Sequence, residues 1–158
     1  GERARAVAGA EIAAIGNAEN ESLGIEIGYR YDGSPVISSE AATPPLLDPL
    51  VHRGGTWPGT RAPSLFLANG TAMFDLFGPG FTLVDFAGVV VAPLMDAARR
   101  AGLPLDHLRI GDPHARAVYE RDLVLVRPDQ HVAWRGDALP GNPRALIDLV
   151  RGARTQLE

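Results

Sequence analysis

The sequence lacks two residue types that carry much of protein chemistry. It has no cysteine, and all 15 of its basic residues are arginine. Without cysteine, disulfides, thiol redox chemistry and cysteine-ligated metals are excluded within this chain. Without lysine, a Schiff-base lysine and the lysine of a phosphate-binding loop are excluded as well.

Long apolar runs and a surplus of basic charge are also missing. No apolar stretch approaches the roughly 18 residues of a membrane-spanning helix, and no signal peptide is recognisable, so a cytoplasmic location is expected. The net charge is -4, and no basic patch marks a nucleic-acid surface. The 158 residues, 46% of them apolar, are enough for one globular domain with its own core. The sequence begins at Gly1 without methionine, and from composition alone both a fragment of a longer chain and a stand-alone protein stay open.

The stretch from Asp122 to Gly136 has the pattern of a β-hairpin. Two arms, Leu123–Val126 and His131–Trp134, flank the four residues Arg127–Gln130, which contain the turn-forming pair Pro-Asp. The first arm has no polar residue, so we expect it to be buried on both faces. The pattern predicts a central hairpin that the rest of the domain covers.

Residues 58–158 are predicted to form one domain around this hairpin. Further strands are expected at Leu65–Leu67, Met73–Phe77, Phe81–Phe86 and His107–Ile110, with a hairpin turn at Asn69-Gly70. Helices are expected from Pro93 to Gly102, from Asp112 to Tyr119 and from Asn142 onward, the last burying Leu146, Leu149, Val150 and Ala153. This alternation predicts an α/β fold, a thioredoxin-like mixed sheet flanked by helices.

Residues 1–57 are predicted to form a separate N-terminal helix and β-hairpin arm. Residues 2–15 have a weak helical pattern. From Leu23 to Tyr31, apolar residues alternate with Gly, Glu, Gly and Arg, which is typical of a strand, and Asp32-Gly33 favours a hairpin turn. The two glycines favour close packing of another backbone over a ligand. Residues 38–60, rich in proline and glycine, form the connection, with Trp57 as an anchor.

Few residues form a pattern that supports catalysis. In a redox-active thioredoxin, the thiols lie where the central strand enters the next helix, and here Ala87–Pro93 holds only alanine, glycine, valine and proline. Asp112 and His114 are a local acid–base pair or, as we favour, part of a helix cap. No Gly-x-Ser-x-Gly or Gly-x-Gly-x-x-Gly motif supports a hydrolase triad or a dinucleotide site. The histidines lack metal-ligand spacing and are interpreted as surface or hydrogen-bonded residues: His52, His107, His114 and His131.

Three arginines lie beside predicted turning points. Arg61 precedes an Ala-Pro pair, and its planar fork suits a carboxylate or backbone carbonyls. Arg127 and Arg135 flank the hairpin turn and the end of its second arm. Together with Asp129 and Trp134 they are predicted to be scaffold or interdomain contacts, and solvated side chains are the alternative.

Four motifs resemble one family in their order along the chain. They are Leu-Gly-Ile-Glu-Ile-Gly-Tyr-Arg-Tyr-Asp-Gly-Ser-Pro at Leu23–Pro35, Pro-Gly-Thr-Arg-Ala-Pro at Pro58–Pro63, Asp-Leu-Phe-Gly-Pro-Gly-Phe-Thr-Leu at Asp75–Leu83 and Leu-Val-Arg-Pro-Asp-Gln-His-Val-Ala-Trp-Arg at Leu125–Arg135. Together they resemble the C-terminal, thioredoxin-like domain of FAD-dependent aromatic-ring hydroxylases, the phenol-hydroxylase-like flavoprotein monooxygenases. That group includes phenol hydroxylases and polyketide-tailoring hydroxylases.

The resemblance implies a parent enzyme that uses FAD and NAD(P)H to hydroxylate a phenol-like or polyketide aromatic ring. It places both cofactors in upstream domains of the same polypeptide. This segment would then hold no cofactor, no metal and no catalytic residue, and would pack onto those domains or take part in a homodimer. A free-standing thioredoxin-like interaction module without redox activity is the alternative.

The sequence departs from the family pattern at two positions. Ser64 stands where the family often has histidine, which weakens any role transferred to that position. Gln130 stands where the hairpin turn usually has glycine. If the turn requires a positive φ, Gln130 costs about 1 kcal/mol relative to glycine.

Overall fold

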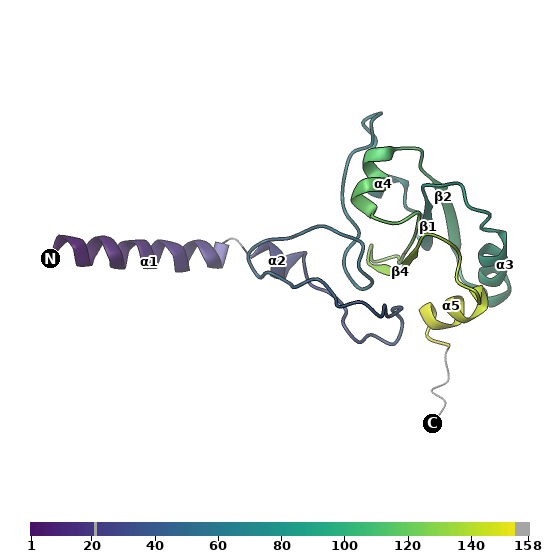
Figure 1. The fold of residues 1–158 in the computed structure, drawn as a ribbon, viewed down its shortest axis with the longest axis horizontal. Coiled ribbons are helices and arrows are strands. Elements are labelled where there is room, and N and C mark those ends of the chain that lie inside the picture. Colours follow the sequence, from purple (N-terminus) through teal and green to yellow (C-terminus); the bar gives the residue numbers. More distant parts are fainter. Residues whose placement is uncertain (21, 154–158) are drawn as a thin grey trace, which may run out of the picture. The chain divides into compact units, whose positions relative to one another are not determined.

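The computed structural model describes residues 1–20 and 22–153, which divide into two compact units (Figure 1). Unit 1 comprises Gly1–Tyr29 and Leu46–Arg53, and unit 2 comprises Arg30–Pro45 and the described residues from Gly54 onward. The division predicted between residues 57 and 58 stays a prediction. No helix in the described part of the chain has the length and apolar character to cross a membrane.

Unit 2 is built on a mixed four-stranded sheet. Its strands, β1 (Phe81–Asp85), β2 (Leu105–Arg109), β3 (Leu123–Val126) and β4 (Val132–Gly136), lie in the order β2-β1-β3-β4. β1 and β2 are parallel, while β3 is antiparallel to both β1 and β4. Three helices complete the unit: α3 (Ala92–Ala101) between β1 and β2, α4 (Pro113–Tyr119) before β3, and α5 (Pro143–Val150) after β4. This order confirms the predicted thioredoxin-like α/β fold.

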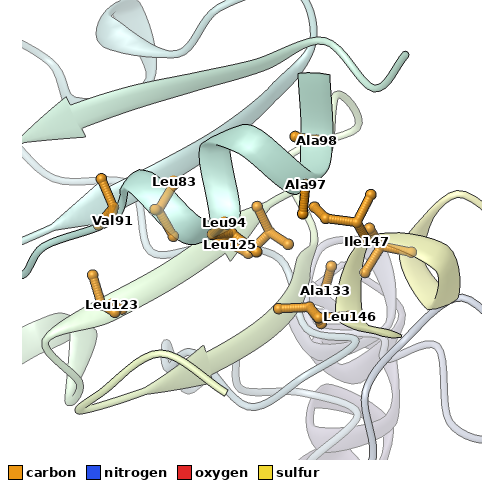
Figure 2. Packing of buried hydrophobic residues seen from close by; sticks show 11 residues of the cluster. Leu83, Val91, Leu94, Ala97, Ala98, Leu123, Leu125, Ala133, Leu146 and Ile147 are labelled. Carbon is orange, nitrogen blue, oxygen red and sulfur yellow. The ribbon is translucent and has the colours of Figure 1, made fainter. Parts of the chain in front are cut away.

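The hairpin of β3 and β4 lies between two apolar cores. All four residues of β3 are buried, as its uninterrupted apolar sequence predicts. Leu123 and Leu125 contact the core beneath α3 and α5, which Figure 2 shows from close by. Val124 and Val126 face the opposite core, which α4 and the segment before β1 cover. The prediction that the domain is wrapped around this hairpin is confirmed.

Helix ends in unit 2 follow the local signals. Asp112 Oδ1 accepts a hydrogen bond from the Ala115 N–H (3.0 Å) at the start of α4, and Asn142 Oδ1 does the same for Ala145 (3.0 Å) at α5. The buried face predicted for α5 needs one correction. Leu146 and Val150 are buried, Leu149 is only partly buried, and Ile147 is buried as well. Ala153 is exposed because α5 ends at Val150.

The predicted strands at Leu65–Leu67 and Met73–Phe77 are both wrong. Residues Met73–Leu76 form a short 3-10 helix, η1, and only an isolated bridge between Phe66 and Ala72 remains of the predicted hairpin. Met73 is fully buried in the core beside α4. The 3-10 turn of Met73–Leu76 thus carries Met73 into this core directly after the Asn69-Gly70 turn.

Unit 1 contains α1 (Glu2–Asn20) and the single turn α2 (Leu23–Glu26). The strand predicted from Leu23 to Tyr31 is therefore wrong. The Ile27 and Gly28 N–H groups donate to the Leu23 carbonyl (both 3.1 Å), which closes a helical turn. The predicted close packing of glycine is confirmed, since a Cβ at Gly24 would lie 1.7 Å from the Asp48 carbonyl oxygen.

The predicted return arm of this hairpin also does not form in unit 2. Asp32-Gly33 makes a turn with Gly33 at φ +71°, but Val36-Ile37 are not a strand. Instead the Ser38 N–H donates to the Ala133 carbonyl (2.9 Å) and Arg30 forms an isolated bridge with Thr60. This segment therefore lines the outer edge of β4 and covers backbone groups that would otherwise be exposed.

Candidate functional site

The hairpin turn carries an ion pair between neighbouring residues. Arg127 Nε and Nη2 donate to the two carboxylate oxygens of Asp129 (3.1 and 3.0 Å), and Asp129 Oδ1 also accepts from the His131 N–H (3.2 Å). Desolvation acts to raise the pKa of Asp129, but these donors outweigh it and lower that pKa. The guanidinium of Arg127 lies 5.8 Å from the centroid of the Tyr31 ring. The ion pair between Arg127 and Asp129 therefore stabilises the conformation of the turn.

Gln130 has a φ of +66°, so the hairpin turn does require the left-handed conformation. Its side-chain oxygen accepts from Arg61 Nε (3.3 Å) and Nη2 (2.7 Å), and its carbonyl accepts from the Ala62 N–H (2.8 Å). Arg61 also lies over the Phe74 ring at 5.1 Å. The structure therefore joins Arg61 to the hairpin turn, which lies 69 residues further along the chain.

Arg135 connects segments that are far apart in sequence. Its Nε and Nη2 donate to the Glu40 carboxylate (2.6 and 3.2 Å), and its Nη1 donates to Glu120. The guanidinium lies 5.0 Å from the Trp57 ring centroid, so Trp57 serves as an anchor within unit 2. Burial acts to lower the pKa of Arg135, but the two carboxylates outweigh this effect and raise it. The Arg135 side chain is only 7% exposed, so its buried charge is compensated by the two carboxylates.

A buried hydrogen-bond chain lies beside Arg135. Arg135 Nη1 donates to Thr56 Oγ1 (3.4 Å), and Thr56 Oγ1 donates to the Tyr119 carbonyl (2.6 Å). The Tyr119 hydroxyl in turn donates to the Pro63 carbonyl (2.9 Å), and burial raises the pKa of Tyr119. The sequence gives no local signal for Thr56, Glu40 or Glu120, because each acquires its role only through a contact made across the fold.

Trp134 packs on the core and takes no part in the polar contacts of the neighbouring Arg135. Trp134 pairs with Leu125 in the sheet and packs against the core beneath α3 and α5. Its ring lies so close to Gly136 that an added Cβ there would come within 2.7 Å of it. Trp134 is thus separate from the Arg135 contact, although the two residues are adjacent in sequence.

Asp85 occupies the junction where a redox-active thioredoxin carries its thiols. This fully buried carboxylate accepts from the N–H groups of Ala87, Gly88 and Val89 (2.7–3.3 Å) and contacts His107 Nε2 at 3.0 Å. Desolvation acts to raise the pKa of Asp85, but its hydrogen bonds lower that pKa overall. A charged residue ending a buried apolar strand was the available sequence signal for this site.

The same junction does not fit a dinucleotide such as FAD. The loop N–H groups that could hold a phosphate already donate to Asp85, and a buried carboxylate repels a second anion. Within residues 1–20 and 22–153, no group of three histidine, aspartate or glutamate side chains is placed to hold a metal ion. His131 contacts the Asp129 carbonyl and the Tyr31 ring, and His114 lies on exposed α4 surface.

Comparison with known proteins assigns the fold to a family. The family model described as "Aromatic-ring hydroxylase, C-terminal" matches residues 55–154. The chain belongs to this family. The matched residues include the whole sheet of unit 2 and the three arginines Arg61, Arg127 and Arg135, so the family is carried by the thioredoxin-like unit.

Two individual proteins are similar to this chain over most of its length, but the chain covers only a small part of each. The FAD-dependent monooxygenase apdD of Emericella nidulans is 39% identical over 135 residues, which is 80% of this chain and 22% of that protein. Phenol 2-monooxygenase of a Pseudomonas species is 32% identical over 164 residues, covering 89% of this chain and 27% of that protein.

Solved structures of related proteins superpose over nearly the whole chain. The native and K252c-bound RebC-10x aligns with a TM-score of 0.84 at 38% identity, over 98% of this chain and 29% of that one. The flavin-dependent monooxygenase PieE, in complex with FAD and substrate, aligns with a TM-score of 0.69 at 34% identity, over 93% and 28%. The chain thus spans between a fifth and a third of the length of these relatives.

Proposed function

We propose that this chain is the C-terminal domain of an FAD- and NAD(P)H-dependent monooxygenase that hydroxylates a phenol-like or polyketide aromatic ring. In this proposal the segment is catalytically silent. FAD, the nicotinamide and the aromatic substrate bind in upstream domains of the same polypeptide, and this chain stabilises those domains by packing onto them. The family membership and the share of each relative that the chain covers support this assignment.

The observation that carries the packing role is the apolar surface of unit 1. Its large apolar side chains are exposed on both helices and on the returning segment: Val7, Ile12, Ile15, Leu23, Ile25, Leu46, Leu47, Leu50 and Val51. Leu46 is 93% exposed and Ile15 is 73% exposed. A water-exposed surface of this composition is typical of an interface whose partner is missing.

The proposed scaffold role of the hairpin residues is supported by their ion pairs within the fold. Arg127 pairs with Asp129 inside the turn, and Arg135 pairs with Glu40 and Glu120 across three segments of unit 2. These groups are engaged in holding the fold, which supports architecture over catalysis for them. Trp134 contributes apolar contact to the core in the same way.

Amide hydrogen exchange on the chain alone and on the full-length parent tests the packing role. We expect the unit 1 amides, including those of Leu50 and Val51, to exchange more slowly in the parent, because upstream domains cover this unit. Equal exchange in both proteins would contradict the proposal. Exchange that slows with rising concentration of the chain alone would show that a homodimer covers the surface instead.

A free-standing interaction module is the second candidate, and the same exposed surface favours it. The two candidates differ in what the gene encodes upstream of Gly1. An open reading frame that continues into a Gly-x-Gly-x-x-Gly segment supports the hydroxylase domain. A start codon close to Gly1 supports the module.

A further inference from the structure

Arg61 differs from the other half-buried arginines of unit 2 in its charge partners. Those arginines each form an ion pair with at least one carboxylate: Arg30 with Asp32, Arg116 with Asp122 and Asp137, Arg121 with Asp137, Arg127 with Asp129, and Arg135 with Glu40 and Glu120. Arg61 is also half-buried, yet it pairs with no carboxylate in residues 1–20 and 22–153. Its positive charge is therefore not compensated within the described chain.

The guanidinium of Arg61 is nevertheless held in one position. Two of its five N–H groups donate to Gln130 Oε1, and the Phe74 ring lies 5.1 Å from its central carbon. Its backbone is fixed by a bridge to His131, and the neighbouring Ala62 N–H donates to the Gln130 carbonyl. A side chain that is already ordered loses less conformational entropy when it binds a further group.

Gln130 makes this arrangement at a conformational cost. Its φ of +66° is a region that glycine enters freely and that side-chain-bearing residues rarely adopt. A glycine in this turn would remove the strain but also the amide that orients Arg61. A strained residue whose side chain positions an uncompensated charge points to a binding role for that charge.

We propose that Arg61 is a carboxylate-binding site, whose ligand is an aspartate or glutamate side chain in the upstream part of the same polypeptide. A guanidinium binds a carboxylate through parallel N–H···O bonds, and a neutral amide partner such as Gln130 leaves that charge attraction available. The proposal rests on the proposed packing function. The upstream source is favoured because the matching family model is described as C-terminal and most of the length of each relative lies outside the region that this chain covers.

The test compares amide exchange at Gly59–Ala62 in the chain alone and in the full-length parent. The Gly59 and Ala62 N–H groups donate to the Val132 and Gln130 carbonyls, so they report on the surroundings of Arg61. In the parent we expect these amides to exchange at least about tenfold more slowly than in the chain alone. A desolvated charge pair between Arg61 and an upstream carboxylate would stabilise the contact by at least that factor.

Three substitutions and a control make the test specific. R61M keeps the apolar stem but not the charge, and should return the parent's exchange rates to those of the chain alone, whereas R61K should retain part of the slowing. Q130E supplies a carboxylate to Arg61 from within the chain. It should slow exchange in the chain alone but speed it in the parent, because it competes with the upstream carboxylate. R109M removes an exposed arginine from β2 and should leave exchange at Gly59–Ala62 unchanged in both the chain alone and the parent.

The outcomes separate this proposal from the packing function. If the parent protects unit 1 but R61M leaves Gly59–Ala62 as slow as in the wild type, the Arg61 site is wrong while the packing function stands. The Arg61 site is also wrong if Q130E changes the exchange rate in the same direction in both proteins. It is wrong as well if the slowing depends on protein concentration and therefore comes from a second copy. If neither unit 1 nor Gly59–Ala62 is protected in the parent, the packing function itself fails.

Discussion

Gln130 combines an unfavourable backbone conformation with a favourable side-chain contact, and the two effects are separable by mutation. In the R61M background, we expect Q130G to raise the free energy of unfolding by about 1 kcal/mol, because only the strain is removed. In the wild type the gain should be smaller or reversed, since two hydrogen bonds to a guanidinium are lost as well. Urea unfolding of the wild type, the two single variants and the double variant measures the coupling between Arg61 and Gln130. An equal gain from Q130G in both backgrounds would contradict it.

Arg135 is the residue whose charge holds the most distant segments together. We expect R135M to lower the free energy of unfolding by about 2 to 3 kcal/mol, because Glu40 and Glu120 lose their shared partner and Thr56 loses a donor. R127M is the matched control in the same hairpin. Its pair with Asp129 is local and partly exposed, so its loss should cost less than about 1 kcal/mol in the same urea titration. Similar costs for the two variants would contradict this account of Arg135.

Asp85 gives the fold a predictable dependence on pH. Its folded pKa lies below the unfolded value of about 3.9, so its stabilisation is present above that value and is lost as the pH falls below it. D85N keeps an oxygen that accepts from the loop N–H groups but does not titrate. We therefore expect the free energy of unfolding to fall less steeply with decreasing pH in D85N than in the wild type below about pH 4. The difference in slope corresponds to at most one proton, the one that Asp85 takes up on unfolding. Parallel pH profiles for the wild type and D85N would be the contrary result.

At the scale of elements, the sequence predicts α1 and the main sheet and helices of unit 2, but not the conformation of Leu23–Tyr31 or of Met73–Phe77. The starts of α4 and α5, the end of α3 at Gly102 and the buried β3 strand depend on caps and on apolar runs, which are local properties. The Leu23–Tyr31 stretch fails because its alternation of glycine and apolar residues also suits a helical turn packed closely on another backbone. In that stretch the apolar residues do not form one buried face.

The candidate site was predictable only in part, for the same reason. Turn residues such as Arg127 and Asp129 interact with near neighbours, so the sequence places them. The contacts of Arg61 with Gln130 and of Arg135 with Glu40 span 69 and 95 residues. Such pairs depend on the tertiary fold, and no local pattern specifies them.

Gly24 shows what the close packing in unit 1 requires. An added Cβ would overlap the Asp48 carbonyl, so we expect G24A to destabilise the contact between α2 and the 46–53 segment by about 1 to 3 kcal/mol. The exchange of the Leu50 and Val51 amides, which donate to Asp48, should then accelerate. G9A is the control, since nothing lies within 4 Å of a Cβ there and alanine favours the helix by about 0.5 to 1 kcal/mol. Unchanged exchange in G24A would argue against the packing seen here.

At the scale of the whole molecule, the two units differ in how complete they are. Unit 2 has two apolar cores, and the exposed large apolar residues described in it are few: Tyr31, Phe66 and Val90. Unit 1 exposes large apolar side chains along all of its segments. This contrast supports the proposal that unit 1 packs onto other domains of the parent protein.

The proposed function places this chain in a flavoenzyme whose chemistry takes place elsewhere in the polypeptide. Measuring flavin content and NAD(P)H oxidation of the purified chain, beside the full-length parent, tests this most directly. We predict a colourless chain that neither retains added FAD nor oxidises NADH or NADPH, and a yellow parent that does both. A chain that purifies yellow, with a flavin stoichiometry near one, would contradict the account.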